Sequence, residues 1–219
     1  MSRSKSKLAI SPNTPADVLW ELAMEDDELA VLVACNPGCG DELVARIYSL
    51  LLSQNYELSA ACVVLEGGNV SPTLLQKILD DFPGLNEERD VDYPGETSYG
   101  VLLAQHPDTP TLILEKLVES PYYLVRERLG LRADLPLHVS EKLVRDECFW
   151  VRQEIACNPV LSPSGLLILA KDADPSIRLK VAVHPNATKE ILESLSTDCI
   201  KEVSRAALCS LSSFETKVL

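Results

Sequence analysis

The chain has few aromatic residues, no long uninterrupted hydrophobic run and no surplus of basic residues. Aromatic side chains make up 5% of its 219 residues, whereas hydrophobic residues make up 46%. The core must therefore consist mostly of Leu, Val, Ile and Ala, a composition that suits packed helices. No segment approaches the roughly 18 apolar residues that a membrane-spanning helix needs. We therefore expect no membrane insertion.

The charge balance argues against a nucleic-acid-binding protein. The formal net charge is −13 at pH 7, and neutralising phosphates requires a surplus of Lys and Arg. The acidity is concentrated in the first half: residues 1–110 hold 6 Lys or Arg against 18 Asp or Glu, and residues 111–219 hold 14 against 15. This concentration predicts either a solubilising face or a surface for a basic partner.

The beginning of the sequence and its cysteine content bear on location. The basic stretch MSRSKSK leads into LAISPNTPADVLWELA, which lacks the apolar core of a signal peptide. We expect a disordered lead-in over residues 1–7. The 7 cysteines are odd in number, and without a secretory signal they are typical of reduced thiols in a cytosolic protein. The sequence therefore predicts a cytoplasmic protein.

One sequence motif occurs twice at a fixed interval. VRQEIACNP covers residues 151–159, and IRLKVAVHP follows 26 residues later at 177–185. Four lines of 26 residues align without gaps from Pro107 onward. Two columns of this alignment are apolar throughout: Leu117, Leu143, Leu169 and Leu195 in one, and Val125, Val151, Ile177 and Val203 in the other. A period of this size is typical of a stacked repeat.

Each repeat contains two apolar patterns with helical spacing. Leu114 and Leu117 represent the first, and Val125 and Leu129 the second. A polar or Pro-bearing break separates them, and Asn-Pro or His-Pro follows the second, where Pro cannot continue a helix. Each repeat is therefore predicted to be a helical hairpin whose second helix is short or partly 3₁₀. Such a hairpin buries its apolar face only by stacking on its neighbours.

Looser copies of the repeat occupy the first half of the chain. Their first parts cover residues 11–26, 36–47 and 68–79, and these copies bring the total to about seven repeats. The acidic, Pro- and Gly-rich stretch 81–100 is predicted to be an inserted loop. A closing segment from about residue 200 lacks the Asn-Pro and is predicted to act as a C-terminal cap. We therefore expect an all-α solenoid, an α-α superhelix, over residues 8–219.

These motifs resemble a known family. VRxxxAxNP, TPxxLLxxLA and DxDPxxR resemble the leucine-rich repeat variant family and, more distantly, HEAT-like repeats, over nearly all of residues 8–211 and best over 107–209. The resemblance implies a right-handed superhelix of alternating α and shorter, often 3₁₀, helices. Some members carry an N-terminal cysteine cluster that binds iron and sulfur. Here only Cys35, Cys39 and Cys62 lie near that end, so we carry over no cofactor and no metal ligand.

The remaining cysteines and the histidines fit structural roles. Cys35, Cys157 and Cys209 fall in a column that holds apolar residues in sister repeats, which predicts packing in the core. His106 and His184 precede Pro where sister repeats have Asn, which predicts a role in the turn. No Ser/His/Asp or Cys/His set stands at a recognisable catalytic spacing. We therefore expect no enzymatic activity.

A row of arginines recurs with the repeat. Two sets of residues repeat every 26 positions: Arg126, Arg152 and Arg178 in the second helix, and Asp146, Asp172 and Asp198 in the break. Bidentate pairing of an Arg with the Asp of its own or the next repeat would tie repeats together. The alternative is a row of arginines along a groove that reads an acidic peptide or a phosphate.

Two groups of residues are candidates for partner binding. Aromatic side chains are favoured anchors at interfaces, although a Trp can instead pack between repeats, and the acidic stretch offers charge. The candidates are Tyr122, Tyr123 and Trp150 in the breaks, and Glu87, Glu88, Asp90 and Asp92 in the acidic stretch.

The sequence favours a non-catalytic scaffold that binds a protein or peptide, with a basic partner among the candidates. A metal or iron–sulfur repeat protein is the alternative, prompted by the cysteines and the resemblance. A HEAT-like enzyme acting on nucleic acid is a third hypothesis, and the acidic charge weighs against it.

Overall fold

The computed structural model describes residues 3–53, 57–66, 70–82 and 99–217. Within these ranges the chain forms α-helices and no strand. The helices are α1 (Arg3–Ile10), α2 (Ala16–Glu25), α3 (Asp27–Ala34), α4 (Asp41–Ser53), α5 (Glu57–Glu66), α6 (Pro72–Asp81), α7 (Tyr99–Gln105), α8 (Thr111–Leu117), α9 (Tyr123–Gly130), α10 (Leu137–Leu143), α11 (Phe149–Ile155), α12 (Pro163–Leu169), α13 (Pro175–Ala182), α14 (Lys189–Leu195) and α15 (Lys201–Lys217).

The chain divides into two compact units. Unit 1 covers Met1–Pro110 and unit 2 covers Thr111–Leu219. The division coincides with the change in charge, because unit 1 holds 6 Lys or Arg against 18 Asp or Glu. A single solenoid over residues 8–219 stays a prediction, and each unit is described by itself.

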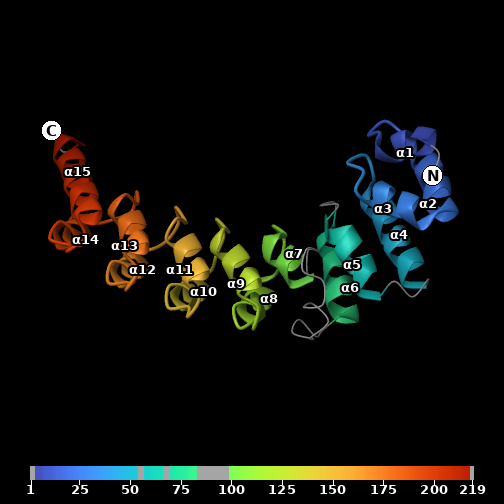
Figure 1. Cartoon of the computed structure of the whole chain (residues 1–219). Coiled ribbons are helices and arrows are strands. Elements are labelled where there is room, and N and C mark those ends of the chain that lie inside the picture. The colour runs from blue at the N-terminus through green and yellow to red at the C-terminus, as the bar shows by residue number, and fades with distance from the viewer. Residues whose placement is uncertain (1–2, 54–56, 67–69, 83–98, 218–219) are drawn as a thin grey trace. The chain divides into compact units, whose positions relative to one another are not determined.

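The helices follow one another as hairpins. In unit 2, helices α8 to α15 make four consecutive pairs, in agreement with the predicted two-helix repeat. In unit 2, helices α8, α10, α12 and α14 form one layer, and α9, α11, α13 and α15 form the other (Figure 1). Contacts run within each pair and between successive helices of the second layer. The predicted all-α solenoid class is therefore confirmed.

The sequence determines where these helices begin. Ser162 and Thr188 cap α12 and α14, accepting hydrogen bonds at 3.2 and 3.3 Å from the backbone N–H groups of Gly165 and Ile191. A capping side chain satisfies a backbone donor that has no partner within the helix. Pro occupies the first position of α12 and α13, where a missing N–H costs nothing.

The second helices of the first three pairs in unit 2 are short. Helices α9, α11 and α13 span 8, 7 and 8 residues and are α-helical. Each ends in a tighter turn with a bond from residue i to i−3, as from the N–H of Asn158 to the carbonyl of Ile155 at 3.1 Å. The short second helix is thus confirmed, and the 3₁₀ pattern is confined to its last turn.

The two predicted columns lie in the interior of unit 2. Leu117, Leu143 and Leu169 are fully buried, and Leu195 is 2% exposed. The second column, formed by Val125, Val151, Ile177 and Val203, is at most 1% exposed. Both helices of each repeat therefore contribute buried apolar residues to the core that joins successive hairpins.

The prediction that Cys35, Cys157 and Cys209 pack in the core is wrong. All three are exposed, and so are Leu131 and Val183 in the same column, at 50% and 63%. This column follows the buried column of Leu129 by two residues. Two residues subtend about 200° around a helix, so the side chains of the two columns point in opposite directions.

The two ends of the described chain differ from simple expectation. Helix α1 begins at Arg3, inside the stretch predicted to be a disordered lead-in, and buries Ala9 completely. Helix α15 continues for 17 residues because no Asn-Pro interrupts it. Ser210 takes the position of the missing Asn and donates a hydrogen bond to the carbonyl of Ala182 at 2.7 Å. No described helix is long and apolar enough to cross a membrane.

Candidate interaction surface

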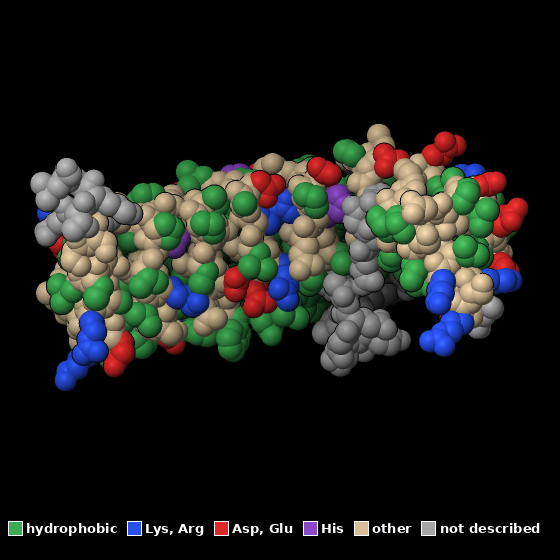
Figure 2. Space-filling view, turned by 90° about the horizontal axis from the view of Figure 1, so that it is seen from above, with side chains coloured by type: hydrophobic (Ala, Val, Ile, Leu, Met, Phe, Trp, Pro, Cys, Tyr) green, Lys and Arg blue, Asp and Glu red, His purple; other side chains and the backbone are tan. Residues whose placement is uncertain are grey.

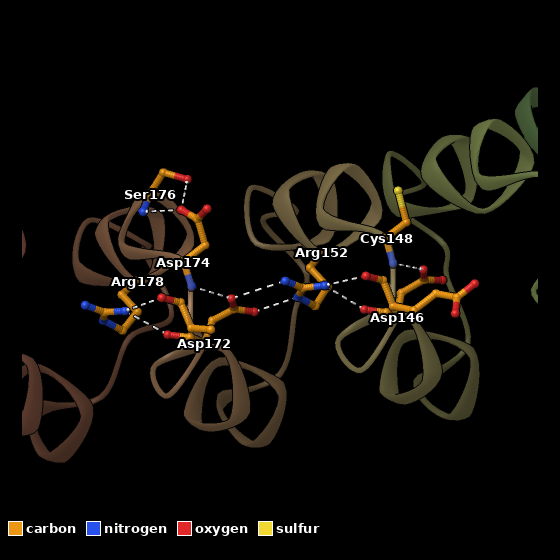
Figure 3. A network of polar contacts seen from close by, with 9 residues as sticks. Asp146, Cys148, Arg152, Asp172, Asp174, Ser176 and Arg178 are labelled. Atoms are coloured by element: carbon orange, nitrogen blue, oxygen red, sulfur yellow. Dashed lines mark hydrogen bonds and ion pairs between the residues drawn. The ribbon is translucent and has the colours of Figure 1, made fainter.

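The recurring arginines and aspartates meet across repeats. Arg126, Arg152 and Arg178 each donate from Nε to Oδ2 of the Asp 20 residues later, at 2.7 Å in every case. The Nη2 group donates to Oδ1 of the same carboxylate at 3.0, 3.3 and 3.0 Å. The Asp belongs to the next repeat, so each pair ties one hairpin to its successor. Figure 3 shows the pair formed by Arg152 and Asp172. We call this row of pairs the Arg–Asp ladder.

Further hydrogen bonds hold each rung of the ladder. Arg152 Nη1 donates to the carbonyl of Asp146 in its own repeat at 2.8 Å. Each Asp also accepts from the backbone N–H two residues later, as Asp146 does from Cys148 at 2.8 Å. Hydrogen bonding to the carboxylates raises the pKa of all three arginines. The guanidinium groups are thus already paired, which argues against a groove that reads an acidic peptide or a phosphate.

The last rung makes stability depend on pH. The hydrogen bond from Arg178 lowers the pKa of Asp198 to about 2, below the unfolded value of about 3.9. The contribution of the pair is therefore complete above about pH 4 and is lost as the pH falls toward 2. We expect Asp198→Asn to lower the free energy of unfolding by about 1 kcal/mol at pH 7. In urea titrations this difference should shrink below pH 4, and a constant difference down to pH 3 would contradict the assignment.

The turn residues form a second row of cross-repeat bonds. Asn158 donates from Nδ2 to the carbonyls of Gly130 and Arg132 at 2.6 and 2.8 Å, and its Oδ1 accepts from Val160 at 3.0 Å. His184, at the equivalent position of the next repeat, makes similar contacts with its imidazole ring. Its Nδ1 accepts from the N–H of Asn186 at 3.1 Å, and its Nε2 donates to the carbonyl of Asn158 at 2.8 Å. These contacts place a ring proton on Nε2 and an acceptor at Nδ1.

The exposed aromatic side chains lie at equivalent positions of adjacent repeats. Tyr123 and Leu124 begin α9 and are 42% and 46% exposed, whereas Tyr122 just before them is half-buried. Phe149 and Trp150 begin α11, packed edge to face with ring centroids 5.1 Å apart. Trp150 is 52% exposed, so most of its surface is not packed between repeats. We call Tyr123, Leu124, Phe149 and Trp150 the aromatic patch.

The layer that carries the aromatic patch has mixed character. Seen from the side of α9, α11 and α13, hydrophobic side chains are interspersed with both acidic and basic ones (Figure 2). This arrangement agrees with the near balance of 14 Lys or Arg against 15 Asp or Glu in residues 111–219. A surface of this kind favours contacts with a protein over contacts with a polyanion.

A groove between α8 and α10 is lined by paired charges. It has a volume of about 1030 Å³ and includes Glu119, Glu141 and Lys142. His138 Nε2 lies 2.8 Å from Glu115 Oε1, and Lys142 pairs with Glu119. Both contacts join successive repeats, and neither was expected from the sequence. Two oppositely charged pairs at this groove, Lys142 with Glu119 and Arg126 with Asp146, are therefore satisfied within the protein.

The remaining predicted candidates are not brought together. Glu87, Glu88, Asp90 and Asp92 lie outside the described residues. Within the described ranges, no group of three or more His, Cys, Asp or Glu side chains is placed to hold a metal ion. Burial raises the pKa of the Cys39 thiol to about 11, so the thiolate that a metal requires is disfavoured there. The metal and iron–sulfur hypothesis finds no support in this geometry.

The stacked hairpins and their two rows of cross-repeat bonds define a helical-repeat protein. Residues 3–54 match the model of the Leucine Rich Repeat Variant domain. This match confirms the resemblance, and it falls on helices α1 to α4, where the copies of the repeat are looser. No curated protein matches the chain at a significant level.

Proposed function

We propose that the chain is a non-catalytic helical-repeat scaffold that binds a protein partner through the aromatic patch. The observation that supports this most is the exposure of Trp150, 52%, beside Tyr123 and Leu124 in the neighbouring repeat. Tyr and Trp are enriched at the energetic centres of protein interfaces. The Arg–Asp ladder fixes the repeats that carry the patch, so little ordering cost is expected on binding.

The acidity of unit 1 suggests the charge of the partner. With 6 Lys or Arg against 18 Asp or Glu in residues 1–110, unit 1 attracts a basic surface and speeds encounter with it. Glu87, Glu88 and Asp90 stay candidates for this contact by sequence. Reversing these three charges should weaken binding of such a partner without affecting folding.

Affinity capture with matched variants tests the role of the aromatic patch. We expect the Tyr123→Ala/Trp150→Ala variant to recover at least about tenfold less of the partner found with the wild-type chain, because two anchors are lost. Leu112→Ala/Val183→Ala is the control, since both of its residues are 63% exposed but lie outside the patch. Mass spectrometry quantifies the recovered partner, and circular dichroism verifies folding. Undiminished capture by the folded patch variant would contradict the proposal.

A further inference from the structure

Unit 1 contains a groove between its first two repeats. Helices α2 and α4 form its walls, and its volume is about 620 Å³. Asp17, Trp20 and Glu21 line it from α2, and Asp41, Glu42 and Arg46 line it from α4. The spacing of three or four residues places the lining side chains of each helix on one face. This volume can enclose one or two long side chains of a partner.

The carboxylates of this groove are not neutralised within the protein. Asp17, Glu21, Asp41 and Glu42 are exposed, and none of them forms an ion pair with a described residue. The N-termini of α2 and α4 contribute about half a positive charge each, and Arg46 adds one more. Two of the four negative charges therefore remain uncompensated. The groove attracts cations.

The groove already holds one cation against an aromatic ring. The guanidinium carbon of Arg46 lies 4.0 Å from the centroid of the Trp20 ring, and the indole is only partly buried. This stack shows that the Trp20 ring accepts a planar cation on its face, and the half-buried indole keeps an exposed part that Arg46 does not need. The apolar stem of a Lys or Arg from a partner can lie along the indole while its charged end meets Glu21 or Glu42.

Comparison with the equivalent groove of unit 2 shows that the fold does not require this arrangement. Counted from the buried Leu column, Trp20 corresponds to Glu115 and Glu42 corresponds to His138. In unit 2 the residues at these two positions, Glu115 and His138, are joined by a contact of 2.8 Å. In unit 1 the Trp20 ring stacks against Arg46 instead, and Glu42 forms no ion pair with a described residue, so this carboxylate is left for another cation.

We propose that the groove between α2 and α4 binds a basic segment of a protein partner, with an Arg or Lys side chain seated beside Trp20 among the four carboxylates. This inference rests on the proposed function and assigns the chemistry of the segment that docks on unit 1. The aromatic patch supplies apolar contacts, and the groove selects for positive charge.

A hexa-arginine peptide is the probe for this site. In a Trp150→Phe background Trp20 is the remaining indole of the chain's 2 tryptophans, so its fluorescence reports on the groove. We expect saturable binding that changes Trp20 emission at 0.15 M salt, where interactions beyond about 8 Å are screened. Isothermal titration calorimetry supplies the affinity independently of fluorescence. A hexaglutamate peptide should give no change.

Two charge-matched variants separate the groove from general attraction. Glu21→Lys/Glu42→Lys should weaken binding at least about tenfold, because both reversals act at the site. Asp80→Lys/Asp108→Lys changes the net charge of unit 1 equally at exposed positions outside the groove, and should change affinity less than about twofold. If circular dichroism shows that the Lys variant is unfolded, Glu21→Gln/Glu42→Gln with Asp80→Asn/Asp108→Asn replaces the comparison.

The outcomes distinguish this inference from the proposed function. Equal losses in the two variants, or no binding of hexa-arginine by the wild-type groove, would overturn the inference. If capture of a partner still depends on Tyr123 and Trp150 in that case, the scaffold function stands while the groove assignment fails. Conversely, the peptide could bind the groove specifically while partner capture does not depend on the aromatic patch. That result would support the cation site and contradict the binding role proposed for the patch.

Discussion

Replacing Leu143 by alanine is expected to lower the free energy of unfolding by about 2–5 kcal/mol. Leu143 is fully buried in the middle of the Leu column of unit 2, so the truncation leaves a cavity that both neighbouring repeats line. Because each hairpin is stable only through its neighbours, the loss reaches beyond α10. Urea denaturation, followed by the helical signal in circular dichroism, measures the change in the free energy of unfolding.

Leu112→Ala is the matched control for this substitution. Leu112 lies in helix α8 and is 63% exposed, so removing its side chain should change stability by less than about 0.5 kcal/mol. If the two variants unfold at the same urea concentration, the Leu column is not the interior of the repeat array.

Replacing Asp146 by alanine is expected to destabilise the protein by about 3 kcal/mol. The side chains of Arg126 and Asp146 are 9% and 8% exposed. The substitution removes two hydrogen bonds from the guanidinium and a third from the N–H of Cys148, and leaves a nearly buried cation. Urea denaturation at neutral pH measures the loss.

Two further variants show whether the effect comes from the buried charge. Glu119→Ala breaks the exposed pair with Lys142 and should cost less than about 0.5 kcal/mol. Arg126→Met/Asp146→Ala removes both charges and should be more stable than Asp146→Ala alone, because no buried cation is left unpaired. A double variant that is no better than the single one would contradict the buried-pair explanation.

The sequence predicted the fold well because the core residues recur at the same positions of successive repeats. Leu143 and Val151 recur at the repeat period and are buried, since a stacked repeat presents the same positions to the same neighbours. The error at Cys157 has a local origin. Identity within a column says that positions are equivalent, but it does not say which way they face, and Cys157 lies opposite the buried Ile155.

The candidate sites were less predictable. The sequence left open whether Arg152 pairs with the Asp of its own or the next repeat. The geometry resolves this because Asp146 already receives Arg126, and only its backbone carbonyl remains for Arg152. Trp20 was missed because the early copies align loosely. An indole at the position that holds Glu115 in a later repeat was the signal that could have revealed the groove.

The cross-repeat bonds of unit 2 run in both directions along the chain. Arg152 reaches forward to Asp172, and Asn158 reaches back to Gly130. The two middle hairpins, residues 133–158 and 159–184, each carry an Asp for the preceding Arg and an Arg for the following Asp, so either can follow the other. These hairpins can be removed or duplicated in frame while every junction stays intact, so the length of such a scaffold, and with it the reach of its binding surface, can change in single steps without redesign of the interior.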